Sequence, residues 1–441
     1  MKNFAEYCDY KRFERYALPY LLGAIKRFLG CEARYDARPI EGALLHHKID
    51  ILDNVNRGVY LLENNTVAII LGRVLNKNEV ICAFSLTLKS SYFIGMEKLL
   101  NNFESALALT LSNAPIKSLS NRPQQFGDEL VELAIAKHLG KGSFDHRKVL
   151  YLASIFKQLA STQLEGSNFT TGLVITRSLF AFSNKSDQTR QGELLPLSKN
   201  YPLSPINPID KRFWYLADGQ TSFYVADKNL ITSNLFITND SETSLSTFVD
   251  DYTLSKSIKG SDILLRVTST SELSIVGSEG IEFNYKENMW RARNLTKISS
   301  IIRSSLEVDE SFAQALIFFL FYLSRERLSS IIWIPNDEIS IGDFIKNKNR
   351  LTIPDLSISN KKHTQTVLRL LSSDGASVIS KAGNLISFGS MIDISKIAID
   401  GIKGSGEIAA STLGKNGLSI KISQDGRIKL FSETLNGPLT F

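Results

Sequence analysis

The chain has 441 residues, of which 43% are hydrophobic and 22% charged, and its formal net charge is +6. This composition is close to the globular average and excludes a disordered, collagen-like or disulfide-rich protein. At about 150 residues per domain, the length favours two to four domains. The positive excess is diffuse, so it does not by itself predict nucleic-acid binding.

Cysteine and histidine are scarce, with three and five copies. Cys8, Cys31 and Cys82 form no CxxC pair, which argues against a zinc or iron–sulfur cluster. An odd number of cysteines without a signal peptide favours reduced thiols inside the cell. His46 and His47 are adjacent, so their side chains point in different directions and do not make a metal-binding pair.

Neither a membrane span nor a secretion signal is predicted. The longest apolar run, Ala315–Leu323, has nine residues, whereas a spanning helix needs roughly 20. The N-terminus carries early charges and no apolar core before a cleavage site. Strings typical of α/β-hydrolases, zincins and P-loop proteins are absent. We therefore expect a cytoplasmic protein without a membrane partner, and we expect no nucleic-acid partner because no basic stripe or DNA-binding module occurs.

Residues 1–147 are predicted to form an α+β domain. An apolar face over residues 21–29 predicts a helix that ends before Gly30. Asn64-Asn65 predicts a tight turn between two strands. The other predicted elements are strands Gly58–Leu62, Val67–Leu71 and Val80–Leu86 and helices Lys98–Leu111 and Glu129–His138.

Residues 148–300 are predicted to form a β-rich middle domain and a candidate sensor. Four prolines between Leu195 and Asp210 predict no regular element there, and the polar Ala181–Gln191 predicts a loop. Phe213–Tyr215 favours core or interface packing, with a ligand-stacking surface as the alternative. The predicted elements are helix Val149–Gln163 and strands Gly172–Arg177, Thr221–Val225, Asn234–Ile237, Ile263–Val267 and Leu273–Val276.

Residues 301–441 alternate helices and strands, which predicts an α/β (mixed α+β) fold with a mixed sheet flanked by helices on both faces. Asp425-Gly426 predicts a hairpin. The predicted helices are Phe312–Leu323, Thr364–Leu371 and Glu407–Leu413, and the predicted strands are Leu328–Ile334, Ser377–Ser380, Leu385–Phe388, Ile392–Ile399, Leu418–Ile422 and Ile428–Phe431.

One pattern occurs twice. Asp218-Gly219 precedes Asn229-Leu230-Ile231 by about the distance that separates Asp374-Gly375 from Asn384-Leu385-Ile386. Each copy predicts a strand, a turn and a second strand. The pattern is compatible with a duplication, or with two independent Asp-Gly turns, which are common.

Three motifs of the last 141 residues are candidates for chemistry. Asp374 can hold a divalent cation, or it can simply form a turn before Gly375. Gly404-Ser405-Gly406 precedes a helix, whose N–H groups attract phosphate, although an ordinary helix entry has the same sequence. Asp425 favours a hairpin turn over a metal site.

In chain order, the landmarks of this region resemble the diadenylate cyclase domain. They are a basic helix end before the strand that begins at Leu328, Asp374-Gly375-Ala376, the Gly404–Ser411 segment, and the strand end at Ser423-Gln424-Asp425. The resemblance covers about residues 305–435. It implies a reaction in which two ATP molecules, held by two facing domains, condense into cyclic di-AMP and release pyrophosphate.

The resemblance also implies roles for individual residues. Asp374 would be catalytic and, together with Asp425, would bind Mg²⁺ or Mn²⁺. Because two domains must face each other, the active form would be a homo-oligomer, with residues 1–300 as a fused sensor region. The nucleotide-binding residues would be Gly375, Ala376, Gly404, Ser405, Gly406, Glu407, Ser423 and Gln424.

The chain also departs from the family pattern. The family's Arg-His-Arg falls on Gly406, Glu407 and Ile408, and Gln424 stands where the family has Glu. Each lost charge-assisted hydrogen bond costs about 1.5–3 kcal/mol of binding. Two functions therefore stay open: an active cyclase, or a degenerate domain that binds a nucleotide or protein partner without turnover. Candidates for the replacement charge are Lys381, Lys403 and Lys421.

Overall fold

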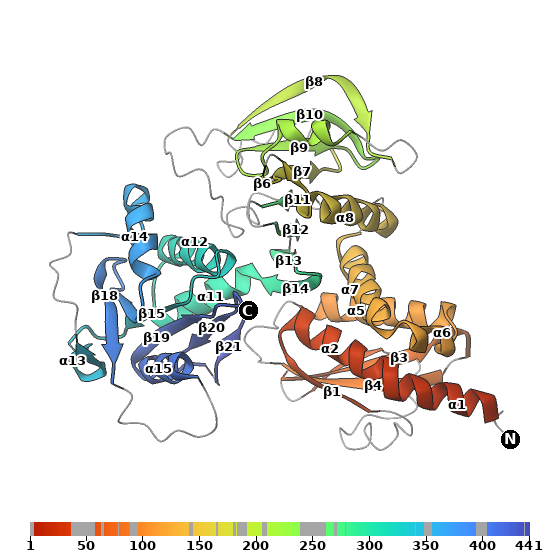
Figure 1. The fold of residues 1–441 in the computed structure, drawn as a ribbon, viewed down its shortest axis with the longest axis horizontal. Helices are drawn as coiled ribbons and strands as arrows, with labels where there is room; N and C mark the ends of the chain where they lie inside the picture. The colour runs from red at the N-terminus through yellow and green to blue at the C-terminus, as the bar shows by residue number, and fades with distance from the viewer. Residues whose placement is uncertain are drawn as a thin grey trace.

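In the residues that it describes, the computed structural model forms three large β-sheets connected by helices (Figure 1) and a small two-stranded sheet, β5 (Gln163–Leu164) with β6 (Ser167–Asn168). It describes residues 4–36, 58–62, 66–77, 79–88, 96–140, 144–164, 166–179, 182, 192–204, 210–238, 262–268, 271–277, 279–339, 341–347, 355–393, 404–435 and 437–441. The predicted Asn64-Asn65 turn and almost all of the predicted loop Ala181–Gln191 and strand Ile392–Ile399 lie outside these residues. Within the described residues, no helix is both long and apolar enough to span a membrane.

The N-terminal sheet is antiparallel, with the strand order β1-β4-β3-β2. Its helix α2 buries Leu21, Ile25 and Phe28 and ends at Gly30, whose φ of 63° is left-handed. Since glycine adopts this conformation without strain, the predicted helix end is confirmed. The elements are α1 (Phe4–Arg12), α2 (Leu18–Leu29), β1 (Glu32–Asp36), β2 (Val59–Leu62), β3 (Val67–Val74), β4 (Glu79–Thr87), α5 (Glu97–Asn113), α6 (Ile116–Asn121) and α7 (Pro123–Leu139).

The middle sheet has eight strands in the order β14-β13-β12-β11-β7-β9-β10-β8, with β7 and β9 parallel. Trp214 is 3% exposed and packs on Phe156 and Tyr224, which confirms core packing for this member of the aromatic trio. The elements are α8 (His146–Ala160), β7 (Thr171–Ile175), β8 (Gly192–Pro202), β9 (Ser222–Ala226), β10 (Ile231–Thr238), β11 (Ile263–Val267), β12 (Leu273–Gly277), β13 (Ile281–Lys286) and β14 (Met289–Asn294).

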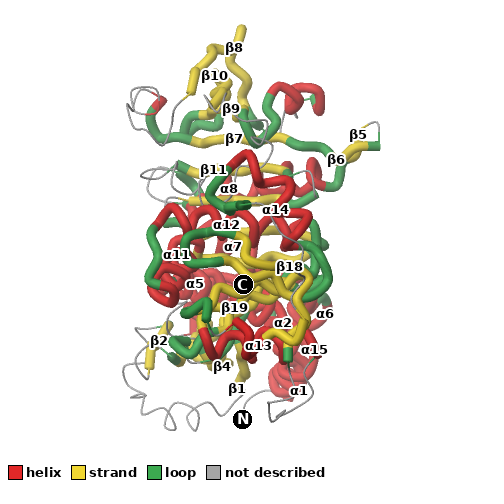
Figure 2. Tube along the Cα trace, turned by 90° about the vertical axis from the view of Figure 1, so that its left-hand side faces the viewer, coloured by secondary structure: helices red, strands yellow, loops and turns green. Residues whose placement is uncertain are grey.

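The expectation that the prolines exclude a regular element was wrong for the first part of that segment. Pro196 and Pro202 lie in the long strand β8, which pairs with β10 alone and so forms the edge of the sheet. Figure 2 shows this strand at the far end of the molecule. An edge strand tolerates proline because its outward-facing backbone groups need no partner strand.

The C-terminal sheet is mixed, with the order β16-β18-β17-β15-β19-β20-β21 and β15 and β17 parallel. Helices cover both faces: Ile332, Ile334 and Ile420 belong to the core shared with α11, α12 and α14, whereas Ile331 and Trp333 pack with α15. The predicted fold class is therefore confirmed. The elements are α11 (Leu295–Leu306), α12 (Glu310–Arg325), β15 (Ser330–Pro335), α13 (Ile341–Phe344), β16 (Ile345–Asn347), α14 (Thr364–Leu371), β17 (Ala376–Ile379), β18 (Leu385–Ile392), α15 (Ser405–Leu413), β19 (Gly417–Ile422), β20 (Ile428–Phe431) and β21 (Leu439–Thr440).

The middle and C-terminal sheets share one strand arrangement. The series β8-β10-β9-β7-β11-β12-β13 and β16-β18-β17-β15-β19-β20-β21 have the same chain order and the same single parallel pair. Their turns also match. Leu230 and Gly383 both have positive φ, and each donates its N–H to the carbonyl three residues earlier at 2.9 Å. Ser271 and Gly426 are a second such pair with positive φ.

The structure thus contains the same topology twice, but the Asp-Gly motifs are not equivalent. Counted back from the two matched turns, Asp374 aligns with Thr221, three residues after Asp218. Counted along β11 and β19, Arg266 aligns with Lys421. These equivalences allow the candidate site to be compared with its counterpart in the middle sheet.

Candidate functional site

Most of the predicted site residues lie at one end of the strands of the C-terminal sheet, which we call the candidate edge. Strands β15 and β17 are parallel and begin at this edge, while β19 is antiparallel to β15 and ends there. Asp374 precedes β17, and Lys421 is near the end of β19. Ala376 and Lys421 are both register partners of Ile331, so they flank β15 on the same face of the sheet. The topology therefore brings Asp374 and Lys421 together from distant parts of the sequence.

Lys421 lies close to several of the candidate residues. Its Nζ atom donates a hydrogen bond to Ser329 Oγ at 2.8 Å. Burial lowers the pKa of the Lys421 amino group, and the nearby negative charge of Asp374 acts in the opposite direction. A half-buried cation is well suited to hold a phosphate group.

Helix α15 begins beside this amino group. Gly404 is its N-cap, and no side chain caps the helix. A Cβ atom at Gly406 would lie 3.1 Å from Lys421 Cε and 3.3 Å from Nζ, so Lys421 occupies the space that a larger side chain at position 406 would need. A positive charge from the neighbouring strand β19 therefore lies at the first turn of this helix.

Glu407, the acidic residue in the first turn of α15, is neutralised by a neighbouring lysine. Glu407 accepts a hydrogen bond from Lys429 Nζ at 2.8 Å. Lys429 is the register partner of Lys421 on β20, so the two lysines stand side by side on the face covered by α15. Because Lys429 pairs with Glu407, this glutamate repels a phosphate at the helix N-terminus less than its charge alone would predict.

Asp374 is exposed, and its carboxylate accepts a hydrogen bond from the Gly375 N–H at 3.0 Å. Gly375 has a φ of +95°, and a Cβ there would lie 2.7 Å from the backbone carbon of Gly389. The fold therefore requires glycine at this position so that β17 can approach β18. Ala376 is fully buried in the cluster under α15, which gives it a packing role.

The remaining predicted residues form the hairpin turn after β19. The Ser423 N–H donates to Arg427 O at 2.9 Å, and Gly426 N donates to Ser423 O at 2.8 Å, which confirms the hairpin. Burial favours a higher pKa for Asp425, but hydrogen bonds from Arg427 and the charges of Arg427 and Arg291 lower it overall. Gln424 is exposed at the tip.

The two aspartates predicted to bind metal have different neighbours. No hydrogen bond, ion pair or electrostatic effect described for this structure joins Asp374 to Asp425, and the described residues contain no group of three His, Cys, Asp or Glu side chains that could hold a metal ion. Asp374 alone still fits Mg²⁺, which proteins often hold by one or two carboxylates together with substrate phosphates.

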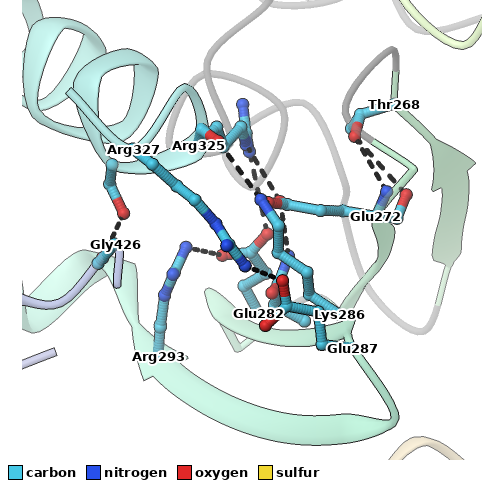
Figure 3. Close-up of polar contacts among 11 residues, drawn as sticks. Thr268, Glu272, Glu282, Lys286, Glu287, Arg293, Arg325, Arg327 and Gly426 are labelled. Atoms are coloured by element: carbon cyan, nitrogen blue, oxygen red, sulfur yellow. Dashed lines mark hydrogen bonds and ion pairs between the residues drawn. The ribbon is translucent and has the colours of Figure 1, made fainter. Parts of the chain in front are cut away.

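A buried polar network connects the hairpin turn to the middle sheet (Figure 3). Ser324, at the end of α12, donates a hydrogen bond to Gly426 O. The next residue, Arg325, lies 3.6 Å from Glu272 Oε2 and 3.8 Å from Glu282 Oε1. Both glutamates are almost completely buried. The turn that carries Asp425 is therefore bound to the end of α12, and the end of α12 is in turn paired with the middle sheet through Arg325.

Sequence reasoning only partly found this arrangement. Lys421 was one of three candidate replacement lysines, of which Lys403 lies outside the described residues and Lys381 lies in the β17–β18 turn at the opposite edge. The useful signal was the alternation along β19, which places Ser419 and Lys421 on the face opposite Leu418, Ile420 and Ile422. Nothing in the sequence singled out Ser329.

Comparison of the chain with models of known protein families finds no match. A comparison with curated proteins also finds none.

Proposed function

We propose that the C-terminal domain binds ATP or a related nucleotide at this edge and is a diadenylate-cyclase-like nucleotidyltransferase. The observation that carries the proposal is the position of Lys421. Its amino group lies beside Gly406 in the first turn of α15, hydrogen-bonded to Ser329 and within electrostatic reach of Asp374. A cation and a helix N-terminus at one place favour phosphate binding.

In the proposed reaction, the N–H groups at the start of α15 and the Lys421 amino group hold the phosphates. The 3′-hydroxyl oxygen of one ATP forms a bond to the α-phosphorus of the other, the bond to pyrophosphate breaks, and Asp374 accepts the hydroxyl proton. Mg²⁺ or Mn²⁺, when bound with Asp374, would supply further charge neutralisation. Closing the ring needs two such sites, so the active form would be a homo-oligomer.

A second candidate function is nucleotide or protein binding without turnover. The specific observation in its favour is that Asp425 is engaged by Arg427, so its carboxylate is not available to a metal without breaking that pair. In both versions, residues 1–300 would act as a sensory region of a cytoplasmic protein, and ATP or another nucleotide would be the partner.

The test is incubation of the purified full chain with ATP and Mg²⁺ or Mn²⁺, followed by mass spectrometry of the products. The proposal expects cyclic di-AMP or a related dinucleotide. Lys421→Gln should weaken ATP binding about tenfold or more, because a charge-assisted hydrogen bond is lost. The matched control is Lys381→Gln, at the opposite edge of the same sheet, which should bind like the wild type.

The outcomes separate the two candidates. If ATP binding depends on Lys421 but no dinucleotide forms, the cyclase proposal is wrong and nucleotide binding without turnover is supported. Equal ATP affinity in the Lys421 and Lys381 variants would contradict both, because the proposed site would then not be the nucleotide site.

A further inference from the structure

A cavity of about 390 Å³ lies where the three parts of the chain meet. Its walls come from the C-terminal end of α2, from β14 of the middle sheet, and from the β19–β20 turn with β20 and β21. Figure 1 shows the end of the chain next to β14, between the C-terminal and N-terminal domains. The lining residues do not include Asp374, Ser405 or Lys421. They do include Asp425 and Lys429, so this cavity borders the candidate site without containing its central residues.

The cavity is strongly basic. The charged residues that line it are Lys26, Arg27, Arg291, Arg427 and Lys429, against the acids Glu32 and Asp425. Lys26 is paired with Glu32 at 2.6 Å, and Lys429 with Glu407 at 2.8 Å. The lining that the structure describes therefore has an excess of positive charge contributed by all three parts of the chain.

Arg291 is the side chain with the least favourable surroundings. Burial lowers the pKa of its guanidinium, and the positive charges of Arg293 and Arg427 lower it further. Asp425 and Glu272 oppose this effect, but the Asp425 carboxylate already accepts hydrogen bonds from the backbone and the guanidinium of Arg427. A half-buried guanidinium near two others is destabilised by like-charge repulsion unless anions compensate it.

Helix electrostatics account for part of this charge. Lys26 and Arg27 lie in the last turn of α2, where basic side chains complement the negative end of the helix dipole. Arg427 follows Gly426, which contacts Ser324 at the C-terminal end of α12. Arg291 lies within strand β14 and lines the same cavity as Arg427 and Lys429. Basic side chains that line one open volume are an arrangement that proteins use for phosphate groups.

We propose that this cavity binds a small anion that carries two or more phosphate groups. Arg291 and Arg427 would contact the phosphates, and Lys26 and Lys429 would complete the charge on either side. Because the N-terminal, middle and C-terminal parts each contribute a cation, the bound anion would hold them together and stabilise the chain. This site does not use Lys421 or Asp374, although Lys429 borders both it and the proposed nucleotide site.

The experiment is isothermal titration of the full chain with pyrophosphate. It is done in a Lys421→Met background, so that the proposed nucleotide site does not contribute. Arg427→Gln and Arg291→Gln are compared with Lys381→Gln, which changes a lysine far from the cavity. Arg427 is exposed, so its variant is expected to fold even if the Arg291 variant does not. Affinity should fall about tenfold or more for each arginine variant and stay unchanged for the control.

Two results would overturn the proposal. One is no measurable pyrophosphate binding in the Lys421→Met background, which would leave the proposed function at Lys421 untouched. The other is binding that Arg427→Gln does not weaken. Binding that is retained in the background and in the Lys381 variant but lost with Arg427→Gln supports the cavity, whatever the outcome of the cyclase assay.

Discussion

The middle and C-terminal sheets have the same topology, but the aspartates at the corresponding strand ends have different surroundings. In the middle sheet, the Asp218 carboxylate accepts hydrogen bonds from the N–H groups of Gln220, Thr221 and Ser222 and from the Thr221 hydroxyl, all between 2.7 and 2.9 Å. In the C-terminal sheet, Asp374 is exposed and faces a lysine across the edge. One aspartate is used by its own loop, and the other remains available to a ligand.

The basic residues of the two edges differ in the same way. Arg266, the counterpart of Lys421, is 2% exposed, whereas Lys421 is half-buried and reaches the start of α15. The comparison teaches that the topology alone does not make a site. The ends of the strands become a candidate site when their charged side chains stay partly exposed and are not already hydrogen-bonded within their own loop.

The largest expected effect concerns the network that joins the two sheets. Glu282→Ala should lower the free energy of unfolding by about 3–5 kcal/mol, because it leaves buried arginines without their partner. Urea denaturation measures this change. The matched control is Glu287→Ala in the neighbouring turn, where Glu287 pairs with Arg327 at the surface and a loss below about 1 kcal/mol is expected. Equal losses would contradict the buried network.

The second prediction compares asparagine substitutions of the two aspartates, Asp374 and Asp218. If the proposed reaction takes place, Asp374→Asn should reduce dinucleotide formation about 100-fold or more, because it removes the carboxylate proposed to accept the proton and to bind the metal. Its unfolding free energy should change by less than about 0.5 kcal/mol, as is usual at exposed positions. Product analysis and urea denaturation of the same sample check both statements.

Asp218→Asn should show the opposite pattern. The loop loses charge-assisted hydrogen bonds, so the free energy of unfolding should fall by about 1–3 kcal/mol, while turnover per folded molecule stays at the wild-type level. If the Asp218 variant lost turnover without losing stability, Asp218 would belong to the active site, and the structural role given to it here would be wrong.

The third prediction concerns Gly375. An alanine there combines a left-handed backbone with a contact of 2.7 Å to the Gly389 backbone, so we expect a loss of about 2 kcal/mol or more in the free energy of unfolding. Gly404→Ala is the control, because no atom lies within 4 Å of the added Cβ. Equal thermal stability of the two variants would mean that β17 and β18 do not approach as described.

The smallest expected effect is the pH dependence that Asp218 contributes. Burial favours a higher pKa for this carboxyl, but hydrogen bonds from Thr221, Gln220 and Ser222 lower its pKa below the ordinary value for an aspartate. A lowered pKa in the folded state stabilises the protein above the unfolded pKa, and this stabilisation is lost as the pH falls through the folded value. Urea denaturation from pH 6 down to about pH 3 should therefore show a shallower acid decline for Asp218→Asn than for the wild type.

Short-range patterns predicted much of the fold. Strand Ile263–Val267, helix Thr364–Leu371 and strand Ile428–Phe431 have the predicted bounds, because continuous apolar runs and helical spacing are local signals. The hairpin at Asp425-Gly426 also follows from local chemistry, since glycine supplies the positive φ that the turn requires.

Local patterns failed where tertiary contacts override them. Strands β13 and β14 were not predicted, because Glu282, Arg291 and Arg293 interrupt the apolar pattern. In the structure, Glu282 and Arg293 are buried and lie 3.5 Å apart, so each charge is compensated across the sheet. Pro196 fits a strand only because β8 is at the edge, which is a property of the whole sheet.

The sequence by itself determined the fold class and most elements. Only the tertiary structure decided that the Lys421 amino group lies beside Gly406 and that Lys429 neutralises Glu407. It also decided that Asp374 stays exposed while Asp218 is used by its own loop. The physical reason is that strand pairing brings together residues that are far apart in the chain, so whether a charge is compensated depends on neighbours that no sequence spacing specifies.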